Sequence, residues 1–254
     1  MQDANEEGAP SGTADARGGA NGGVKGGVTS IAIGTIVAVV AVTSYFAFQT
    51  DRAGETSFWI LACAPTLAVA LASVAIAGRR SALWQQLKPK AGDFSVGFFG
   101  AGVLFAGAYG FVRVVMPAGS PRAMWLARIY LQTGDPNVLR AHPAALFVAL
   151  IVVAAAEEIV WRGVVTSLLA EKIGERFAWA ASAALYALAY VPTMWSLKSP
   201  SAGLDPLLPI AALFAGLGWG WMVKRFDRLP PAIVAHALFD WAVIVMFRLW
   251  GESL

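Results

Sequence analysis

The sequence predicts an all-α fold, a polytopic membrane helix bundle with about seven transmembrane helices. Hydrophobic residues make up 57% of the 254 residues and charged residues only 14%, whereas soluble domains carry nearer a quarter charged residues. The mean hydropathy is +0.62. The apolar residues also gather in runs close to the roughly 20 residues that a helix needs to cross the hydrocarbon core.

The chain begins with a segment, residues 1–27, that has almost no large apolar side chains. It is rich in glycine, alanine and acidic residues, a composition that cannot bury enough apolar surface to fold. Its acidic start differs from the basic start of a signal peptide. We therefore predict a disordered N-terminal tail over residues 1–27.

Seven apolar runs follow the tail. If the chain has an eighth run that this count misses, the C-terminus lies on the opposite side of the membrane. Their approximate limits are 28–49, 57–78, 94–116, 143–167, 177–193, 206–223 and 231–250. A polar stretch over 117–142 contains Trp125, Ile129 and Tyr130, which favours a short interfacial helix. Residues 28–142 thus form an N-terminal unit of transmembrane helices with an interfacial segment.

Loop charges predict the orientation of the bundle. Most loop lysines and arginines lie in the tail and in the second, fourth and sixth loops, which share one side of the membrane. The positive-inside rule then puts the N-terminus in the cytoplasm. The net charge of +3 fits this orientation signal better than a nucleic-acid footprint, so we expect a lipid bilayer and no nucleic acid as partner. The expected location is a bacterial cytoplasmic membrane.

Cysteine and histidine are scarce, which narrows the choice of metal sites. Cys63 is the single cysteine, so an internal disulfide and a cysteine-based metal site are both excluded. The two histidines are His142 and His236. Any metal site would therefore depend heavily on carboxylates.

Three charged residues interrupt the fourth apolar run, and an ionisable residue in a membrane span is a functional candidate by default. Glu158 and Arg162 are four residues apart, so they can pair on one helix face, either as a purely structural ion pair or as part of a site. Glu157 is rotated by about 100° on the helix. We expect Glu157 to face another partner or a water-filled cavity, where a carboxylate can act as a general base.

Polar residues also interrupt the later runs. His236 and Asp240 are again four residues apart, and the aspartate can orient the imidazole or join it as a metal ligand. For His142 at a membrane boundary and for Arg113 near the end of the third run, a structural explanation is favoured. Glu157 and His236 lie roughly 15 and 8 Å from the same predicted end of the bundle, so the two sites could meet in one cavity.

The three polar motifs resemble a known family. The chain reads E157-E158-I-V-W-R162, then Y186-A-L-A-Y190 followed by V-P, then H236-A-L-F-D240. This order resembles the CPBP family, the CAAX-processing and bacteriocin-immunity-related intramembrane proteases. The resemblance covers residues 143–250, which would form a CPBP-like catalytic core, whereas the first three spans match only as generic membrane helices.

The resemblance implies a role for each motif residue. Glu157 would activate the water that attacks a peptide carbonyl, with Glu158 and Arg162 as support. His236 and Asp240 would form a polar pocket, assigned in the family either to metal ligation or to oxyanion binding. Tyr190 stands where the family has a histidine. Tyrosine is a poor metal ligand at neutral pH but a good hydrogen-bond donor. A four-ligand metal site, with zinc as its metal, is therefore not favoured, and a tyrosine-assisted oxyanion pocket and a loss of function are both left open.

Three hypotheses follow from these observations. The first is an intramembrane endopeptidase that cuts a membrane-anchored or lipidated protein. The second is a catalytically silent relative that acts as a membrane binding or immunity partner. The third and weakest is a proton-coupled transporter, since buried acids and a histidine suit a proton relay, although the chain has no internal repeat of the kind many transporters show.

Overall fold

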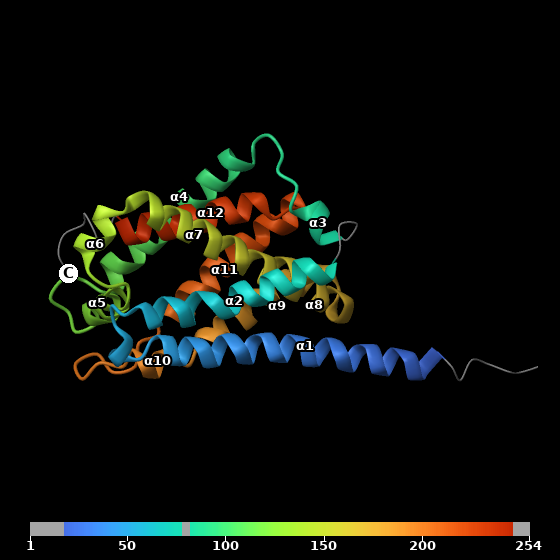
Figure 1. Cartoon of the computed structure of the whole chain (residues 1–254), viewed down its shortest axis with the longest axis horizontal. Helices are drawn as coiled ribbons and strands as arrows, with labels where there is room; N and C mark the ends of the chain where they lie inside the picture. The colour runs from blue at the N-terminus through green and yellow to red at the C-terminus, as the bar shows by residue number, and fades with distance from the viewer. Residues whose placement is uncertain (1–17, 78–81, 246–254) are drawn as a thin grey trace, which may run out of the picture.

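The computed structural model describes residues 18–77 and 82–245, and within these ranges it is a helical bundle (Figure 1). Apart from one isolated bridge, between Ser199 and Gly203, its regular elements are helices. In chain order they are α1 Gly18–Ala47, η1 Thr50–Arg52, α2 Thr56–Ala77, α3 Ala82–Gln86, α4 Asp93–Val115, α5 Ala123–Gln132, α6 Pro136–Ala141, α7 Pro143–Glu158, the π-helix η2 Ile159–Val165, α8 Thr166–Ile173, α9 Glu175–Tyr190, α10 Thr193–Ser196, α11 Leu207–Phe226 and α12 Pro230–Ala242.

The predicted all-α membrane bundle is confirmed. Six helical segments within the described ranges are long and apolar enough to cross a membrane, and a shorter apolar helix, Pro230–Val245, matches the seventh predicted run. The rest of that run, from residue 246, lies outside the described residues. This is an integral membrane protein, because the segments are both long enough and apolar enough to span the hydrocarbon core.

The start of the first helix differs from the predicted tail boundary. Residues 1–17 lie outside the described residues, but α1 already begins at Gly18, so residues 18–27 are helical. Its apolar, membrane-length part begins at Gly27, one residue before the predicted run. Extending an existing helix costs far less than nucleating one, so the apolar span can carry helical structure into the glycine-rich residues before it.

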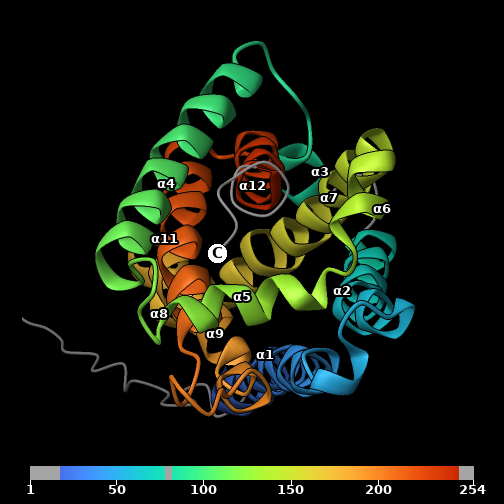
Figure 2. The same cartoon turned by 90° about the vertical axis from the view of Figure 1, so that its left-hand side faces the viewer.

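The core forms where α9, α11, α7 and α12 meet, and α4 lies against α12 (Figures 1 and 2). Gly97 permits the close approach of α4, because an added Cβ would lie 2.6 Å from the Val234 side chain. At the same end of α4, Arg228 Nε donates to Asp93 Oδ1 at 2.5 Å. This ion pair fixes α4 to the short connection between α11 and α12.

The helix predicted within residues 117–142 is present as α5, and α6 follows it. In Figure 2, α5 crosses one end of the bundle between α11 and α2. The hydroxyl of Tyr130 donates to the carbonyl of Val243 at 3.0 Å, and the amide of Gly54 donates to the carbonyl of Gln132 at 3.3 Å. The α5 helix is thereby attached to α12 and to the connection between α1 and α2.

Candidate active site

The two adjacent glutamates lie at the junction between α7 and a π-helical turn. Both are buried, with Glu157 7% and Glu158 0% exposed, and Arg162 follows within η2. A π-turn widens the helix by one residue, so that a backbone N–H bonds to the carbonyl five residues before it. Here the Trp161 carbonyl accepts hydrogen bonds from Ser182 Oγ at 2.7 Å and from Thr166 Oγ1 at 2.8 Å. The backbone N–H of Thr166 donates to the same carbonyl, so three donors hold the local departure from α-helical bonding.

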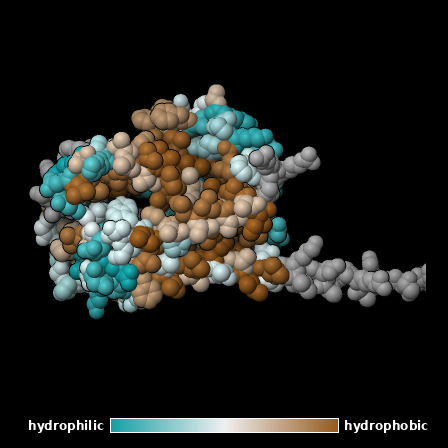
Figure 3. Space-filling model, in the orientation of Figure 1, coloured by the Kyte–Doolittle hydropathy of each residue, from teal (hydrophilic) through white to brown (hydrophobic). Residues whose placement is uncertain are grey.

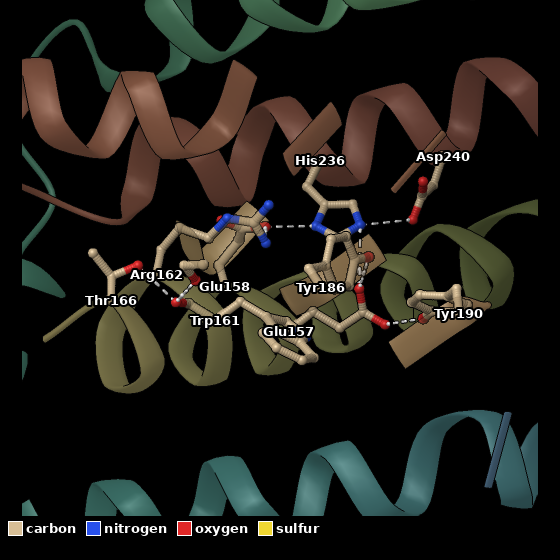
Figure 4. A network of polar contacts seen from close by, with 10 residues as sticks. Glu157, Glu158, Trp161, Arg162, Thr166, Tyr186, Tyr190, His236 and Asp240 are labelled. Atoms are coloured by element: carbon tan, nitrogen blue, oxygen red, sulfur yellow. Dashed lines mark hydrogen bonds and ion pairs between the residues drawn. The ribbon is translucent and has the colours of Figure 1, made fainter. Parts of the chain in front are cut away.

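Glu158 is the centre of a buried charged cluster (Figure 4). Its Oε1 accepts from Arg162 Nη1 at 3.1 Å and lies 2.9 Å from His236 Nδ1. An ionised carboxylate can only accept hydrogen bonds, so Nδ1 carries the proton in this contact. The predicted pairing of Glu158 with Arg162 is present, and His236 is the third member of this buried cluster. This arrangement leaves His236 Nε2 for the neighbouring groups.

Glu157 is held by two tyrosine hydroxyls from α9 (Figure 4). Tyr186 donates to its Oε2 at 2.5 Å, and Tyr190 donates to its Oε1 at 3.1 Å. The Nε2 atom of His236 lies 3.8 Å from Glu157 Oε2 and 3.4 Å from Asp240 Oδ2. The i,i+4 spacing of the tyrosines on α9 and of His236 and Asp240 on α12 therefore brings both pairs to one carboxylate.

Aromatic rings enclose the charged groups. The guanidinium of Arg162 lies over the rings of Tyr186 and Trp219, 4.9 and 5.2 Å from the two centroids. Trp219 also stacks on His236, with the ring centroids 3.7 Å apart and an interplanar angle of 17°. Such rings stabilise a cation through their faces while they keep out water.

A cavity of about 660 Å³ reaches the site. Glu157, Tyr186, Tyr190, His236 and Asp240 contribute to its lining, whereas Glu158 and Arg162 do not. The rest of the wall is mainly apolar and comes from α2, α4, α5, α7, α11 and α12. The face seen in Figure 3 is largely apolar and is hollowed. The two glutamates thus have different surroundings, one at the cavity wall and one in the packed interior.

The structure brings all six predicted site residues together and adds three that the sequence did not assign. The six are Glu157, Glu158, Arg162, Tyr190, His236 and Asp240. Tyr186 was visible as a polar residue in the fifth run, and its place four residues before Tyr190 was the available signal. Ser182 and Trp219 gave no signal, because a serine and a tryptophan in an apolar helix are ordinary packing residues.

The donor set does not suit a zinc site well. Zinc favours several imidazole or thiolate ligands, whereas the cluster described above contains one imidazole, that of His236, and no thiolate. Glu157 already accepts hydrogen bonds from two tyrosine hydroxyls. Within residues 18–77 and 82–245, no group of three or more His, Cys, Asp or Glu side chains is arranged to hold a metal ion.

Comparison with known proteins identifies the part of the chain that holds the site. A family described as type II CAAX prenyl endopeptidase Rce1-like matches residues 140–242. This segment runs from the end of α6 to the end of α12 and contains every residue of the cluster described above. The family resemblance that the three motifs indicated is thereby confirmed for this segment of the chain. No curated protein and no solved structure shows a significant match.

Proposed function

We propose, from the match of residues 140–242 to the Rce1-like CAAX endopeptidases, that this membrane protein is an intramembrane endopeptidase. It hydrolyses a peptide bond of a membrane-anchored or lipidated protein by means of a water molecule that Glu157 activates. One observation carries the proposal: Glu157 is a buried carboxylate at the wall of an apolar cavity, beside His236 and two tyrosine hydroxyls.

Glu157 is the general base of the proposed reaction. A carboxylate offers about four lone-pair sites, so the bonds from Tyr186 and Tyr190 leave room for a water molecule. Glu157 takes one proton from that water, and the oxygen forms a bond to the scissile carbonyl carbon. The mainly apolar wall of the cavity strengthens each of these electrostatic contacts, because apolar groups screen charges less than water does.

Negative charge moves in this step from Glu157 to the carbonyl oxygen. Once Glu157 holds the proton, its oxygen is a weaker acceptor, and the Tyr190 hydroxyl is free to donate to the new oxyanion. A proton on His236 Nε2, held by the nearby Asp240 carboxylate, provides a second donor. The carbon–nitrogen bond then breaks, and the proton on Glu157 passes to the leaving amine.

The cavity supports a substrate that is held in the bilayer. Apolar residues of α2 and α7, among them Trp59, Ala62 and Val153, line it next to Glu157. An extended peptide presents unpaired backbone groups, which are costly in hydrocarbon, whereas this cavity offers polar partners at the reacting bond. An apolar anchor on the substrate would fit the remaining wall.

The catalytically silent alternative is favoured by one specific observation. Both oxygens of Glu157 already accept tyrosine hydroxyls, a closed arrangement that a purely structural cluster would also show. In that reading the protein binds a membrane partner without cutting it. The two readings differ in what the loss of the Glu157 charge does to processing.

The proposed orientation places the N-terminus in the cytoplasm of a bacterial cell. Basic residues Lys88, Lys90, Lys172, Lys224 and Arg228 lie in or beside the connections at the α3 and α8 end of the bundle. Figure 1 shows α3 and α8 at the opposite end from α5 and α6. The positive-inside rule therefore supports a cytoplasmic location for the α3 and α8 end.

The test compares cells that carry the wild-type chain with cells that carry Glu157→Gln. This substitution keeps the size of the side chain and removes its charge. We expect at least one membrane or lipidated protein to keep a segment that wild-type cells remove, detected by mass spectrometry of its termini. The purified pair should then differ in cleavage of that protein in proteoliposomes.

Glu171→Gln is the matched control, because Glu171 is exposed on α8, away from the cavity lining, and it should process normally. If the wild type cleaves nothing that Glu157→Gln leaves intact, the endopeptidase proposal is wrong and the silent relative is favoured. Activity that a chelator removes and zinc restores would show that a metal takes part.

A further inference from the structure

Trp219 of α11 contacts two members of the site, His236 and Arg162. Its indole stacks on the His236 ring at a centroid distance of 3.7 Å and an angle of 17°. The Arg162 guanidinium lies 5.2 Å from its centroid, and Phe239 meets it edge-on at 6.1 Å and 73°. The side chain is only 2% exposed, so its ring is fixed on several sides.

Small residues on α11 make this placement possible. Ala212, Gly216 and Gly220 recur every four residues, a pattern that lets membrane helices approach closely. A Cβ added at Gly216 would lie 3.1 Å from Arg162 Nη2 and 3.2 Å from the Ala183 Cβ, and one at Gly220 would lie 3.3 Å from the Trp179 carbonyl. The close contact of α11 with α9 therefore places Trp219 beside Arg162 and His236.

The hydrogen bond to Glu158 alone does not fix the imidazole. The contact from Nδ1 at 2.9 Å lets the ring tilt about that bond, and the longer Nε2 contact with Asp240 at 3.4 Å resists this tilt only weakly. A nearly parallel aromatic ring on the imidazole face opposes this tilt, since tilting loses the stacking contact. With the ring held, Nε2 stays 3.8 Å from Glu157 Oε2 and 3.4 Å from Asp240 Oδ2.

We propose that Trp219 is a positioning residue that fixes the plane of the His236 imidazole, and so keeps Nε2 directed at Glu157 and Asp240. Its role in catalysis rests on the endopeptidase function proposed above. The orientation of the His236 ring does not depend on that function, because it is a property of the folded protein and is measured without a substrate.

Nuclear magnetic resonance of the histidine ring tests the proposal directly. The chain has two histidines, so ¹⁵N- and ¹³C-histidine labelling in a His142→Gln background isolates the His236 ring. In this otherwise wild-type protein, we expect upfield ring-current shifts of the His236 ring protons and a protonated, hydrogen-bonded Nδ1. Ring protons at ordinary positions would show that the stack is absent and would overturn the proposal without any change at Trp219.

Three variants then separate stacking from general packing. Trp219→Phe keeps an aromatic face and should keep the His236 signals, whereas Trp219→Leu should shift or split them. Trp221→Leu is the matched control, because Trp221 lies on the same helix but is 54% exposed. We also expect diethyl pyrocarbonate to modify His236 faster in Trp219→Leu, on the order of two- to tenfold from the strength of one aromatic contact.

Cleavage of the substrate identified for the wild type supplies the kinetic readout. Trp219→Leu should lower kcat with little change in KM, and Trp219→Phe should restore most of it. Wild-type His236 signals and modification rates in folded Trp219→Leu would overturn the positioning role, whatever the activity. If instead the ring responds as expected while no variant and no wild type cleaves, the positioning role stands and the endopeptidase function fails.

Discussion

Replacing Arg162 by methionine should destabilise the protein strongly while leaving its shape almost unchanged. The guanidinium is buried, with the Arg162 and Glu158 side chains 2% and 0% exposed. Methionine keeps the unbranched, apolar part of the side chain but leaves Glu158 with one of its two hydrogen-bond donors, His236. Breaking a buried pair by removal of one partner costs about 3–5 kcal/mol.

That cost corresponds to a loss of roughly two to three and a half powers of ten in the folding equilibrium. It can be measured by titration with sodium dodecyl sulfate in mixed micelles, followed by far-ultraviolet circular dichroism. The same change at Arg113, which is exposed on α4 and which the sequence already favoured as structural, should stay within about 0.5 kcal/mol.

A compensating substitution makes the argument sharper. Glu158→Gln removes the unpaired charge, and its amide oxygen can still accept from His236 Nδ1. The double variant Glu158→Gln/Arg162→Met should therefore be more stable than Arg162→Met alone, with a coupling of about 1–3 kcal/mol. An Arg162→Met protein as stable as the wild type, or a double variant less stable than the single one, would refute the buried ion pair as the cause.

Three further predictions concern other parts of the chain. Tyr190→Phe removes the proposed oxyanion donor and should lower the rate of cleavage roughly 100- to 1000-fold, while Tyr190→His should keep part of the activity. Gly216→Ala crowds Arg162 Nη2 at 3.1 Å and should cost about 1–3 kcal/mol of stability, whereas Gly102→Ala, with open space around it, should cost less than 1. Burial raises the pKa of the Asp205 carboxyl from 3.8 to about 6, against the Leu207 amide and Arg128. The folded state then binds this proton more tightly than the unfolded state, so stability should rise as pH falls from 7 to 4, a dependence that Asp205→Asn should remove.

The helical bundle and the pairing of the buried charged residues could be predicted, because each depends on local sequence. Composition and run length determine which segments can cross a bilayer, and the i,i+4 spacing is enough to pair Glu158 with Arg162. The expected separation of Glu157 from this pair also agrees with the contacts, since Glu157 bonds to Tyr186 and Tyr190 instead.

The remaining features depend on residues that are far apart in the chain. The π-turn after Glu158 is supported partly by Ser182, which lies 21 residues beyond the Trp161 carbonyl that it binds. Trp219 reaches His236 because Gly216 and Gly220 let α11 pack closely against α9. An isolated serine or tryptophan in an apolar run carries no sign of such a contact, because the same residues would serve equally well in ordinary packing.

The contrast between two adjacent glutamates indicates which of them can act on water. Glu158 accepts from Arg162 and His236 and does not line the cavity, so a proton on it would break the buried cluster. Glu157 lines the cavity, and its partners are neutral hydroxyls that can donate elsewhere. Glu157 can therefore gain a proton with little loss of favourable contacts to its neighbours. The base of the proposed reaction must take up a proton and release it again in each cycle, and the surroundings of Glu157 fit this role better than those of Glu158.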